Sequence, residues 1–322
     1  MTCAPVLLIG FNRPDFMAQQ IEAIRTAKPD RIYIAVDGPR SGRPGEAELC
    51  RQVCECAKQI DWPCEVKTLF RQENLGCKYG VSGAITWFFE NEPEGIILED
   101  DCRPTLDFLL FATEMLSRYR ACERVGAICG FNFFNLQTDR CASYHFSAHM
   151  DVWGWASWRR VWNQYSVDFS ALGREPSETI EMSDMTRYMK KVYHGYLRDL
   201  ERGLSTWDVQ MSILFLERGW LSVVPKVRLI ANCGVAENRA THTGGYDYWG
   251  KDLCRTGSLC FPLVHPSEIS RDRRADILRE KIEGAIFPRA LTFIGTKFHF
   301  LRKLLTLTGR CIERICPILF RI

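Results

Sequence analysis

Gly95-Ile-Ile-Leu-Glu-Asp-Asp101 is the stretch of sequence that decides the fold, because an apolar run passes directly into three consecutive carboxylates. A short continuous apolar run is typical of a strand buried on both faces of a parallel sheet. Three adjacent carboxylates at its end repel one another unless a cation lies among them. They could form a solvated acidic loop, but ligands of such sheets bind beyond the carboxyl ends of the strands. We therefore expect a metal–diphosphate site here, and oxygen ligands favour Mg²⁺ or Mn²⁺ over zinc.

The residues before and after this stretch alternate between apolar runs and helical spacing. Alternation of strands and helices predicts an α/β fold with a mostly parallel, doubly wound central sheet flanked by helices. No linker or repeat interrupts the body, so we expect one domain over residues 1–284, with 1–130 as its nucleotide-binding half and 131–284 as its acceptor half. The predicted strands are 5–11, 31–36, 65–70 and 95–98, and the predicted helices are 15–24, 45–60, 83–89, 106–119 and 184–202.

Charge separates the last residues from the body. The 322 residues carry a net charge of +3, yet residues 285–322 alone hold seven Lys or Arg and one acid. The body is therefore mildly acidic, which argues against a nucleic-acid surface. Residues 298–316 place Leu and Ile on one helical face and basic residues on the other. This pattern predicts an amphipathic helix on an anionic membrane surface, although such a helix can also pack on the body.

The N-terminal apolar run reaches Asn12-Arg13 almost at once, so no signal peptide is expected. No stretch of about 20 apolar residues could span a bilayer. The 15 cysteines are then expected to be reduced thiols. These features together predict a cytoplasmic protein, peripheral on the inner face of the membrane if the tail binds lipid.

Two further strand ends point to the edge of the sheet where the carboxylates lie. Phe11-Asn12-Arg13 follows the first predicted strand, and Asp37 follows the second. Asp37-Gly38-Pro39 could be only a turn, and Asp15 could be only a helix cap. Neither the P-loop spacing nor the dinucleotide-binding Gly-x-Gly-x-x-Gly occurs in the corresponding loops, which argues against ATPases and dehydrogenases. The spacing of Cys50, Cys54 and Cys56 does not fit structural zinc.

In combination, these motifs resemble those of the GT-A glycosyltransferases. The blocks are Phe11-Asn-Arg-Pro14, Val36-Asp-Gly38, Asn74-Leu-Gly76 and the Glu99-Asp-Asp101 stretch, in this order. The chain is most similar to bacterial nucleotide-diphospho-sugar transferases related to the N-acetylglucosaminyltransferase I family. The similarity covers roughly residues 5–266 and includes the tryptophan block of residues 153–158 and Ala240-Thr-His-Thr243.

The resemblance implies roles for individual residues. Asp101 would be the carboxylate that binds the metal, Mn²⁺ or Mg²⁺, and His242 would be a further metal or diphosphate ligand. His242 can also be an ordinary loop histidine. Glu99 and Asp100 would contact the ribose or the metal-bound water. The remaining predicted contacts to the nucleotide sugar are Phe11, Arg13, Asp37, Asn74 and Lys78.

Ser205-Thr-Trp-Asp208 resembles the family segment that carries the catalytic base. Asp208 would be that base, although a helix N-cap is an equally good interpretation of the residue, and the related eukaryotic sequences have two acids after the tryptophan. Trp153 and Trp155 would bind the acceptor sugar by stacking, although the spacing of Trp155, Trp158 and Trp162 also fits a buried helix face.

These inferences predict a metal-dependent glycosyltransferase, a hexosyl- or N-acetylhexosaminyltransferase. It would move a sugar from a nucleotide diphosphate, expected to be UDP, to a hydroxyl of a glycan or lipid-linked acceptor with inversion. A sugar-1-phosphate nucleotidyltransferase is one alternative, but it requires a Gly-rich basic loop after the first strand. A non-catalytic protein of the same fold that binds sugar nucleotides or glycans is the other.

Overall fold

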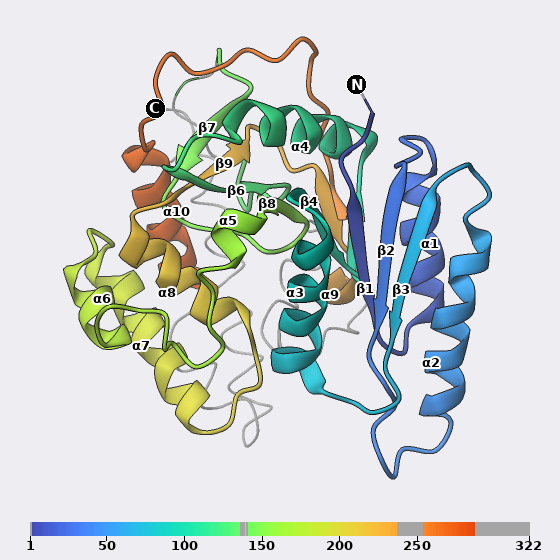
Figure 1. The fold of residues 1–322 in the computed structure, drawn as a ribbon. Helices are drawn as coiled ribbons and strands as arrows, with labels where there is room; N and C mark the ends of the chain where they lie inside the picture. Colours follow the sequence, from blue (N-terminus) through green and yellow to red (C-terminus); the bar gives the residue numbers. More distant parts are fainter. Residues whose placement is uncertain (1, 136–138, 140, 237–253, 287–322) are drawn as a thin grey trace, which may run out of the picture.

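The computed structural model describes residues 2–135, 139, 141–236 and 254–286 (Figure 1). Its centre is an eight-stranded sheet in the order β3-β2-β1-β4-β8-β6-β9-β7, and a two-stranded sheet pairs β10 with β5. The large sheet contains β1 Val6–Gly10, β2 Arg31–Val36, β3 Glu65–Phe70, β4 Glu94–Glu99, β6 Val125–Cys129, β7 Tyr144–Ser147, β8 Trp155–Trp158 and β9 Leu221–Pro225. The small sheet contains β5 Cys102–Pro104 and β10 Ile230–Asn232.

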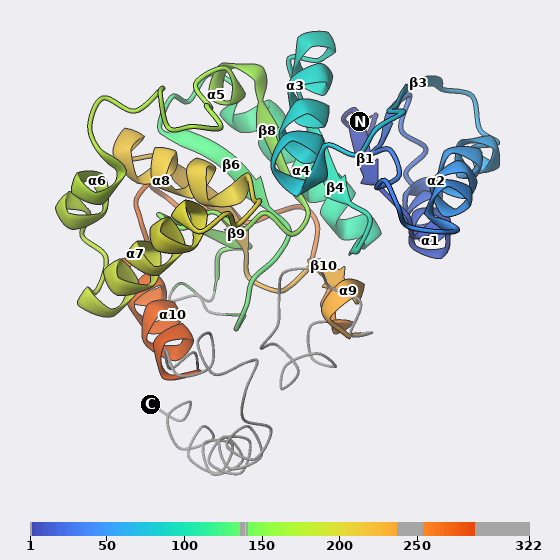
Figure 2. The same ribbon diagram turned by 90° about the horizontal axis from the view of Figure 1, so that it is seen from below.

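The first half of the chain forms a parallel sheet with helices on both faces. Strands β1, β2, β3 and β4 pair in parallel. The chain moves outward from β1 to β3 through α1 Pro14–Arg25, α2 Glu46–Glu55 and η1 Cys56–Gln59. It then returns through η2 Cys77–Val81 and α3 Ser82–Asn91 to β4, on the other side of β1. Because such crossovers are right-handed, this reversal places α3 on the face opposite α1 and α2 (Figure 2).

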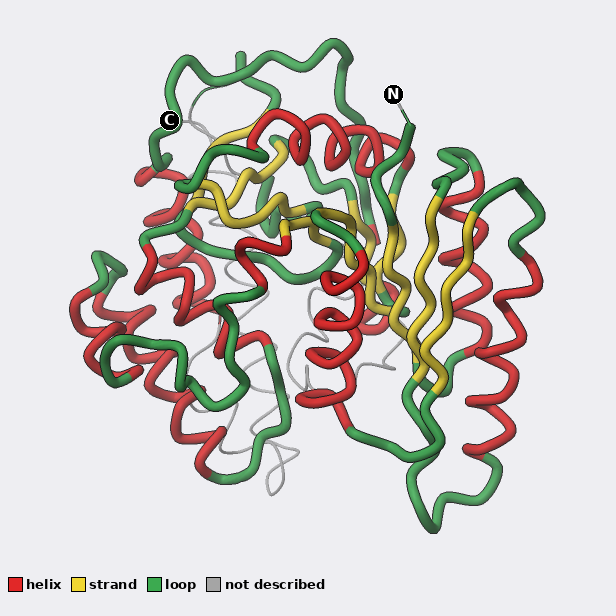
Figure 3. The backbone as a smooth tube through the Cα atoms, in the orientation of Figure 1, coloured by secondary structure: helices red, strands yellow, loops and turns green. Residues whose placement is uncertain are grey.

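Antiparallel pairs enter the sheet beyond β4. Strand β8 runs antiparallel to both β4 and β6, and β7 runs antiparallel to β9. Strands β6 and β9 keep the direction of the first half. Helix α4 Leu106–Tyr119 packs on β4, β6 and β8. Figure 3 shows the continuous sheet in yellow with helices around it. The predicted α/β fold class, a mostly parallel central sheet flanked by helices, is confirmed.

Helices α5, α6, α7, α8 and α10 lie beside the second half of the sheet, whereas α9 contacts β5 (Figure 1). Helices α6 and α8 contact each other, and α7 contacts both α6 and α10. A separate apolar cluster built around Ile180 and Ile213 holds α6, α7 and α8 together. These elements are α5 Arg159–Trp162, α6 Pro176–Met182, α7 Arg187–Glu201, α8 Asp208–Arg218, α9 Cys233–Ala236 and α10 Arg273–Ile286.

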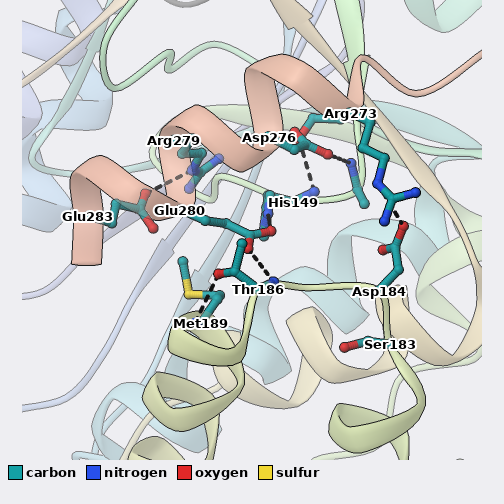
Figure 4. A network of polar contacts seen from close by, with 12 residues as sticks. His149, Ser183, Asp184, Thr186, Met189, Arg273, Asp276, Arg279, Glu280 and Glu283 are labelled. Atoms are coloured by element: carbon teal, nitrogen blue, oxygen red, sulfur yellow. Dashed lines mark hydrogen bonds and ion pairs between the residues drawn. The ribbon is translucent and has the colours of Figure 1, made fainter. Parts of the chain in front are cut away.

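Buried charged side chains attach α10 to the body (Figure 4). Asp276 accepts hydrogen bonds from the Ser147 hydroxyl at 2.6 Å and from the Ala148 backbone at 3.0 Å. Glu280 accepts one from the Thr186 backbone at 2.6 Å and lies 2.9 Å from His149 Nε2. Burial raises the pKa values of both carboxyls, but the nearby His149 and these hydrogen bonds give both a net lowering. Helix α10 is thus an integral part of the domain.

The tryptophan block of the second half spans a strand and the helix that follows it. The helix-face interpretation of the tryptophan block is wrong, because Trp155 and Trp158 belong to strand β8 and only Trp162 lies on a helix. Trp158 and Trp162 are nevertheless buried, as expected of core residues. Cys50 and Cys56 are buried free thiols.

The predicted domain boundary after residue 284 falls near the end of α10, which extends to Ile286. The predicted membrane-binding helix at 298–316 lies outside the described residues. Within the described residues, no helix combines the length and apolar character needed to cross a membrane.

Candidate active site

The site lies where the strand order reverses between β1 and β4. These neighbouring strands are parallel, and Ile9 pairs with Glu99 at their carboxyl ends. Arg13 follows β1, and Asp100 and Asp101 follow β4, so their side chains meet beyond the same edge of the sheet. Ligands of open α/β sheets bind at such a reversal. The placement of the acidic triplet at this edge agrees with the sequence-based expectation.

Arg13 forms an ion pair with the middle carboxylate of the triplet. Its Nε donates to Asp100 Oδ2 at 3.0 Å, and a second guanidinium nitrogen contacts Asp100 Oδ1. The same nitrogen lies 3.9 Å from Asp101 Oδ2. Burial lowers the pKa of Arg13, but the charges of Asp100 and Asp101 outweigh it and raise the pKa overall. The buried Asp100 therefore holds Arg13 at the edge of the site, and one acidic charge is neutralised.

Glu99, Asp101 and Asp208 are acidic side chains whose charges interact, and Arg13 lies 3.9 Å from one of them, Asp101. The pKa of Glu99 is raised well above its usual range, first by burial and then by the charges of Asp101, Asp208 and Asp100. Arg13 opposes this shift without cancelling it. Asp208 begins α8, far away in the sequence, yet its charge acts on Glu99. The fold thus brings the predicted base within range of the charges of the predicted metal-binding triplet.

The donor atoms of this group suit a hard divalent cation. Carboxylate oxygens are the ligands that Mg²⁺ and Mn²⁺ prefer, and the charges of Asp101, Asp208 and Asp100 all act on Glu99. Within the described part of the chain, no three His, Cys, Asp or Glu side chains are arranged to hold a metal ion by themselves. A cation at Asp101 would therefore need further ligands, such as the oxygens of a diphosphate.

The chain after β10 packs closely against Asp101. The Cys233 backbone N–H donates to the Asp101 carbonyl at 2.8 Å. A Cβ atom on Gly234 would lie 2.6 Å from Asp101 Oδ2, so only glycine fits at this position. His242, the other predicted metal ligand, lies outside the described residues, and its role stays a prediction.

Asp37 shapes the loop that follows β3. Its carboxylate accepts hydrogen bonds at 3.0 Å from the Asn74 side-chain amide and from the backbone N–H groups of Leu75 and Gly76. Gly76 adopts a φ of +72°, which glycine tolerates best. Two predicted nucleotide ligands, Asp37 and Asn74, are thus bonded to each other. Any contact that they make with a nucleoside stays a prediction.

The same loop continues to the segment that precedes α8. The backbone N–H of Lys78 donates to the Ser205 hydroxyl at 3.3 Å. Residues Cys77–Val81 form a π-helical turn, a local irregularity that is frequent at functional sites. The loop therefore joins the donor side of the site, at Asp37, to the residues around Asp208.

Asp208 is fixed at the first position of α8. The N-cap interpretation is wrong, because Trp207 occupies the cap position and makes no side-chain capping bond. The Thr206 hydroxyl donates to Asp208 Oδ1, which also accepts from the Val209 backbone at 2.9 Å. Trp207 is buried, with its ring stacked 5.8 Å from that of Trp155. These contacts restrict the conformation of the Asp208 side chain. Both hydrogen bonds are accepted by Oδ1, and neither of them uses Oδ2.

Phe11 is placed by a separate contact on the donor side. The Arg40 guanidinium lies 5.3 Å from the centre of the Phe11 ring and forms an ion pair with Glu46. Asn12 donates to the same Glu46 carboxylate at 3.0 Å. Glu46 therefore ties α2 to the residues that follow β1, and the Phe11 ring lies among these polar contacts.

The two tryptophans predicted to bind the acceptor differ in accessibility. Trp155 is 0% exposed in β8, so its ring belongs to the core and offers no surface to a sugar. This corrects the prediction for Trp155, and the cause is its position on a central strand. Trp153 is half-buried, with its ring centre 4.9 Å from that of Phe131 and 5.2 Å from that of Phe133. Its role at the acceptor stays a prediction.

No protein-family model and no curated protein matches the chain. The relationship to N-acetylglucosaminyltransferase I therefore stays a resemblance. Among solved structures, HddC from Yersinia pseudotuberculosis shares 11% identity and a TM-score of 0.33, over 50% of this chain and 80% of that one. An active-site mutant of LgtC shares 8% sequence identity and a TM-score of 0.37, over 89% of this chain and 99% of that one. Apo UDP-glucose pyrophosphorylase shares 7% sequence identity and a TM-score of 0.36, over 73% of this chain and 95% of that one. At these TM-scores the similarities carry no argument about activity.

Residues that the sequence did not single out complete the site. Thr206 bonds the predicted base, and Ser205 bonds the donor loop. Both belong to the Ser205-Thr-Trp-Asp208 segment, so the sequence showed that they lie close to Asp208. It did not show which groups they bond.

Proposed function

We propose that this protein is a metal-dependent glycosyltransferase that uses a nucleotide-diphosphate sugar, expected to be a UDP-sugar. The acceptor would be a hydroxyl of a glycan or lipid-linked molecule. The observation that supports the proposal is that the charges of Asp101 and Asp208 both act on Glu99, which ends β4 at the strand-order reversal. Transfer of a sugar needs a place for the diphosphate and a base for the acceptor hydroxyl, and this arrangement offers candidates for both.

Each residue has a distinct task in the proposed reaction. Asp208 would accept the proton of the acceptor hydroxyl as its oxygen attacks the anomeric carbon. The bond from that carbon to the diphosphate oxygen breaks, and the nucleoside diphosphate leaves with the bonding electrons. Direct displacement of this kind inverts the anomeric centre. Thr206 would keep Asp208 Oδ1 occupied, so that Oδ2 faces the acceptor.

Asp101 would hold the divalent cation, which when bound neutralises charge on the leaving diphosphate. Arg13, fixed by Asp100, adds a positive charge next to Asp101. The loop from Asn74 to Lys78, held by Asp37 and Ser205, would cover the nucleoside side of the donor.

One observation disfavours the nucleotidyltransferase alternative. Strand β1 ends at Gly10 and α1 begins at Pro14, so only residues 11–13 connect them. A connection this short leaves no room for the Gly-rich basic loop that such an enzyme would use on a triphosphate. Arg13, the cation of this connection, is already engaged by Asp100.

A donor screen tests the proposal. The purified chain is incubated with Mn²⁺ and a panel of nucleotide-diphosphate sugars, and released nucleoside diphosphate is measured. Asp61→Ala, which removes an exposed carboxylate paired with Arg25 at the C-terminal end of α1, is the matched control for Asp101→Ala. Turnover that Asp101→Ala loses and Asp61→Ala keeps supports a transferase. Pyrophosphate formation from a sugar 1-phosphate and a nucleoside triphosphate would instead establish the nucleotidyltransferase, and binding without turnover would establish a binding protein.

A further inference from the structure

A glutamine interrupts the apolar face of α1. The buried residues of this helix are Phe16, Met17, Gln20, Ile21 and Ile24, and all except Gln20 are apolar. Gln20 is 1% exposed, so its amide is removed almost completely from water. An amide is costly to bury unless it is hydrogen-bonded, and an apolar side chain would fit the helical spacing equally well. The hydrogen-bond partners of Gln20 therefore indicate why an amide occupies this position.

The Gln20 amide bridges the two ends of the acidic turn, residues 99–102, where the chain passes from β4 to β5. Its Nε2 donates to the backbone carbonyl of Glu99 and to that of Cys102, the latter at 3.0 Å. Both partners are acceptors, so the nitrogen of the amide and not its oxygen must face them. One side chain thus holds the first and the last residue of the turn, and Asp100 and Asp101 lie between them.

The acidic turn has two further attachments. Arg13 is the cap residue of α1, seven positions before Gln20, and residues at this spacing share a helix face. It holds the side chain of Asp100, whereas Gln20 holds the backbone. In the chain after β10, the Cys233 backbone N–H donates to the Asp101 carbonyl at 2.8 Å. The backbone of the turn is therefore fixed both from α1 and from the chain after β10.

The Asp101 carboxylate is held less tightly than the backbone that carries it. It lies 3.9 Å from Arg13 and accepts from the Cys102 thiol at 3.5 Å. Its direction thus depends on the backbone of the acidic turn, which Gln20 holds. Gln20 Oε1 is buried and has no hydrogen-bond partner among the residues that the structure describes, so the burial of this amide is only partly compensated. Stability alone is a poor reason for a glutamine here.

We infer that Gln20 is a positioning residue, whose amide holds the acidic turn in the conformation that presents the Asp101 carboxylate at the edge of the sheet. Where Asp101 binds a divalent cation, Gln20 would set the affinity for it without touching it. Groups that orient a metal ligand in this way typically change metal affinity by about 10–100-fold. This consequence for the metal rests on the proposed function, but the positioning of the turn does not.

Manganese binding tests the consequence for the metal. Free Mn²⁺ is measured by electron paramagnetic resonance as the metal is titrated into the full-length protein with UDP, and a protein-free titration is the blank. Gln20→Met removes the amide from a side chain of similar length and should weaken Mn²⁺ binding by about 10–100-fold. Gln20→Glu keeps one O–H donor while its buried carboxyl is protonated, so its affinity should lie between those of wild type and Gln20→Met.

Gln210 provides a matched control. It is a second buried glutamine on a helix, and its Nε2 donates to the Val167 carbonyl at 3.2 Å. Its Oε1 also has no partner among the described residues. Gln210→Met should destabilise the fold to a similar extent but leave the Mn²⁺ affinity unchanged. The inference is overturned if folded Gln20→Met binds Mn²⁺ as tightly as wild type, or if Gln210→Met weakens the binding as much.

Hydrogen exchange tests the positioning of the turn without any metal. The backbone amides of residues 100–103 and of Cys233 should exchange faster in Gln20→Met than in wild type, and no faster in Gln210→Met. Unchanged exchange in Gln20→Met would overturn the inference, even where wild type binds Mn²⁺ as the proposed function requires. Faster exchange in Gln20→Met, combined with a wild type that binds no Mn²⁺, would support the positioning role and contradict the metal site of the proposed function.

Discussion

Replacement of Asp208 by asparagine separates a catalytic from a structural role. Asparagine keeps the shape of the side chain and an oxygen that can accept the hydrogen bonds from Thr206 and the Val209 backbone. It loses the negative charge and the ability to accept a proton. If Asp208 is the base, turnover should fall by about 10²–10⁴, the usual contribution of general base catalysis. At 1.36 kcal/mol per factor of ten, this loss corresponds to roughly 3–5 kcal/mol of transition-state stabilisation.

The expected cost in stability is much smaller. Asp208 is the first residue of α8, where a negative charge interacts favourably with the helix dipole by about 0.3–1 kcal/mol. Removal of the charge also relieves repulsion with Glu99, which offsets part of that loss. Thermal unfolding should therefore change little, and the KM for the nucleotide sugar should stay near its wild-type value. Release of nucleoside diphosphate measures turnover, and normal turnover combined with a clear loss of stability would refute the assignment of Asp208 as the base.

Three further predictions concern the surroundings of the site. Thr206→Val should lower kcat by roughly tenfold or more at an unchanged donor KM, because a hydrogen bond to a charged group contributes about 1.5–3 kcal/mol. Thr206→Ser keeps the hydroxyl and should keep the wild-type kcat. A valine variant with the kcat of wild type would contradict the positioning role of Thr206. Trp155→Ala should reduce the free energy of unfolding by about 3–5 kcal/mol in urea titrations, since the ring is fully buried. A stable variant with an altered acceptor preference would instead show that Trp155 contacts the acceptor. The pKa values of Asp276 and Glu280 are lowered in the folded state, so both carboxylates stabilise the fold above their unfolded pKa values, near pH 4, and this stabilisation is lost as pH falls through their folded pKa values. In urea titrations at each pH, Glu280→Gln should lose less stability between pH 5 and 2 than wild type does. Parallel stability curves for the variant and wild type would refute the role of Glu280 in the loss of stability at low pH.

The sequence predicted the first half of the fold closely. Strands β2 and β3 and helix α4 have the predicted bounds, because each is an apolar or periodic run between clear turn residues. The second half was harder. Strands β6, β7 and β9 are short, and the spacing of Trp155, Trp158 and Trp162 imitates a helix face although the chain turns from strand to helix after Trp158.

The candidate site was predictable as an edge of the sheet but not as a network. Carboxylates after a buried strand indicated where Asp101 would lie, because parallel strands end at a common edge. The partners of Arg13, Asp37 and Asp208 depend on which side chains the folded chain brings together across long separations. The spacing of residues along the sequence does not indicate those pairings.

The most direct test of a metal-dependent transferase at the acidic triplet is the turnover of Asp101→Ala. The half-buried Asp101 carboxylate has only the distant contact with Arg13 among its ion pairs in the described residues, so its removal should leave the thermal unfolding temperature near that of wild type. Nucleoside diphosphate release from the preferred donor is measured with Mn²⁺ and with excess EDTA. We predict that wild type is active only with the metal and that Asp101→Ala is inactive under both conditions. Near-wild-type turnover of Asp101→Ala, with the same dependence on divalent metal, would contradict the site.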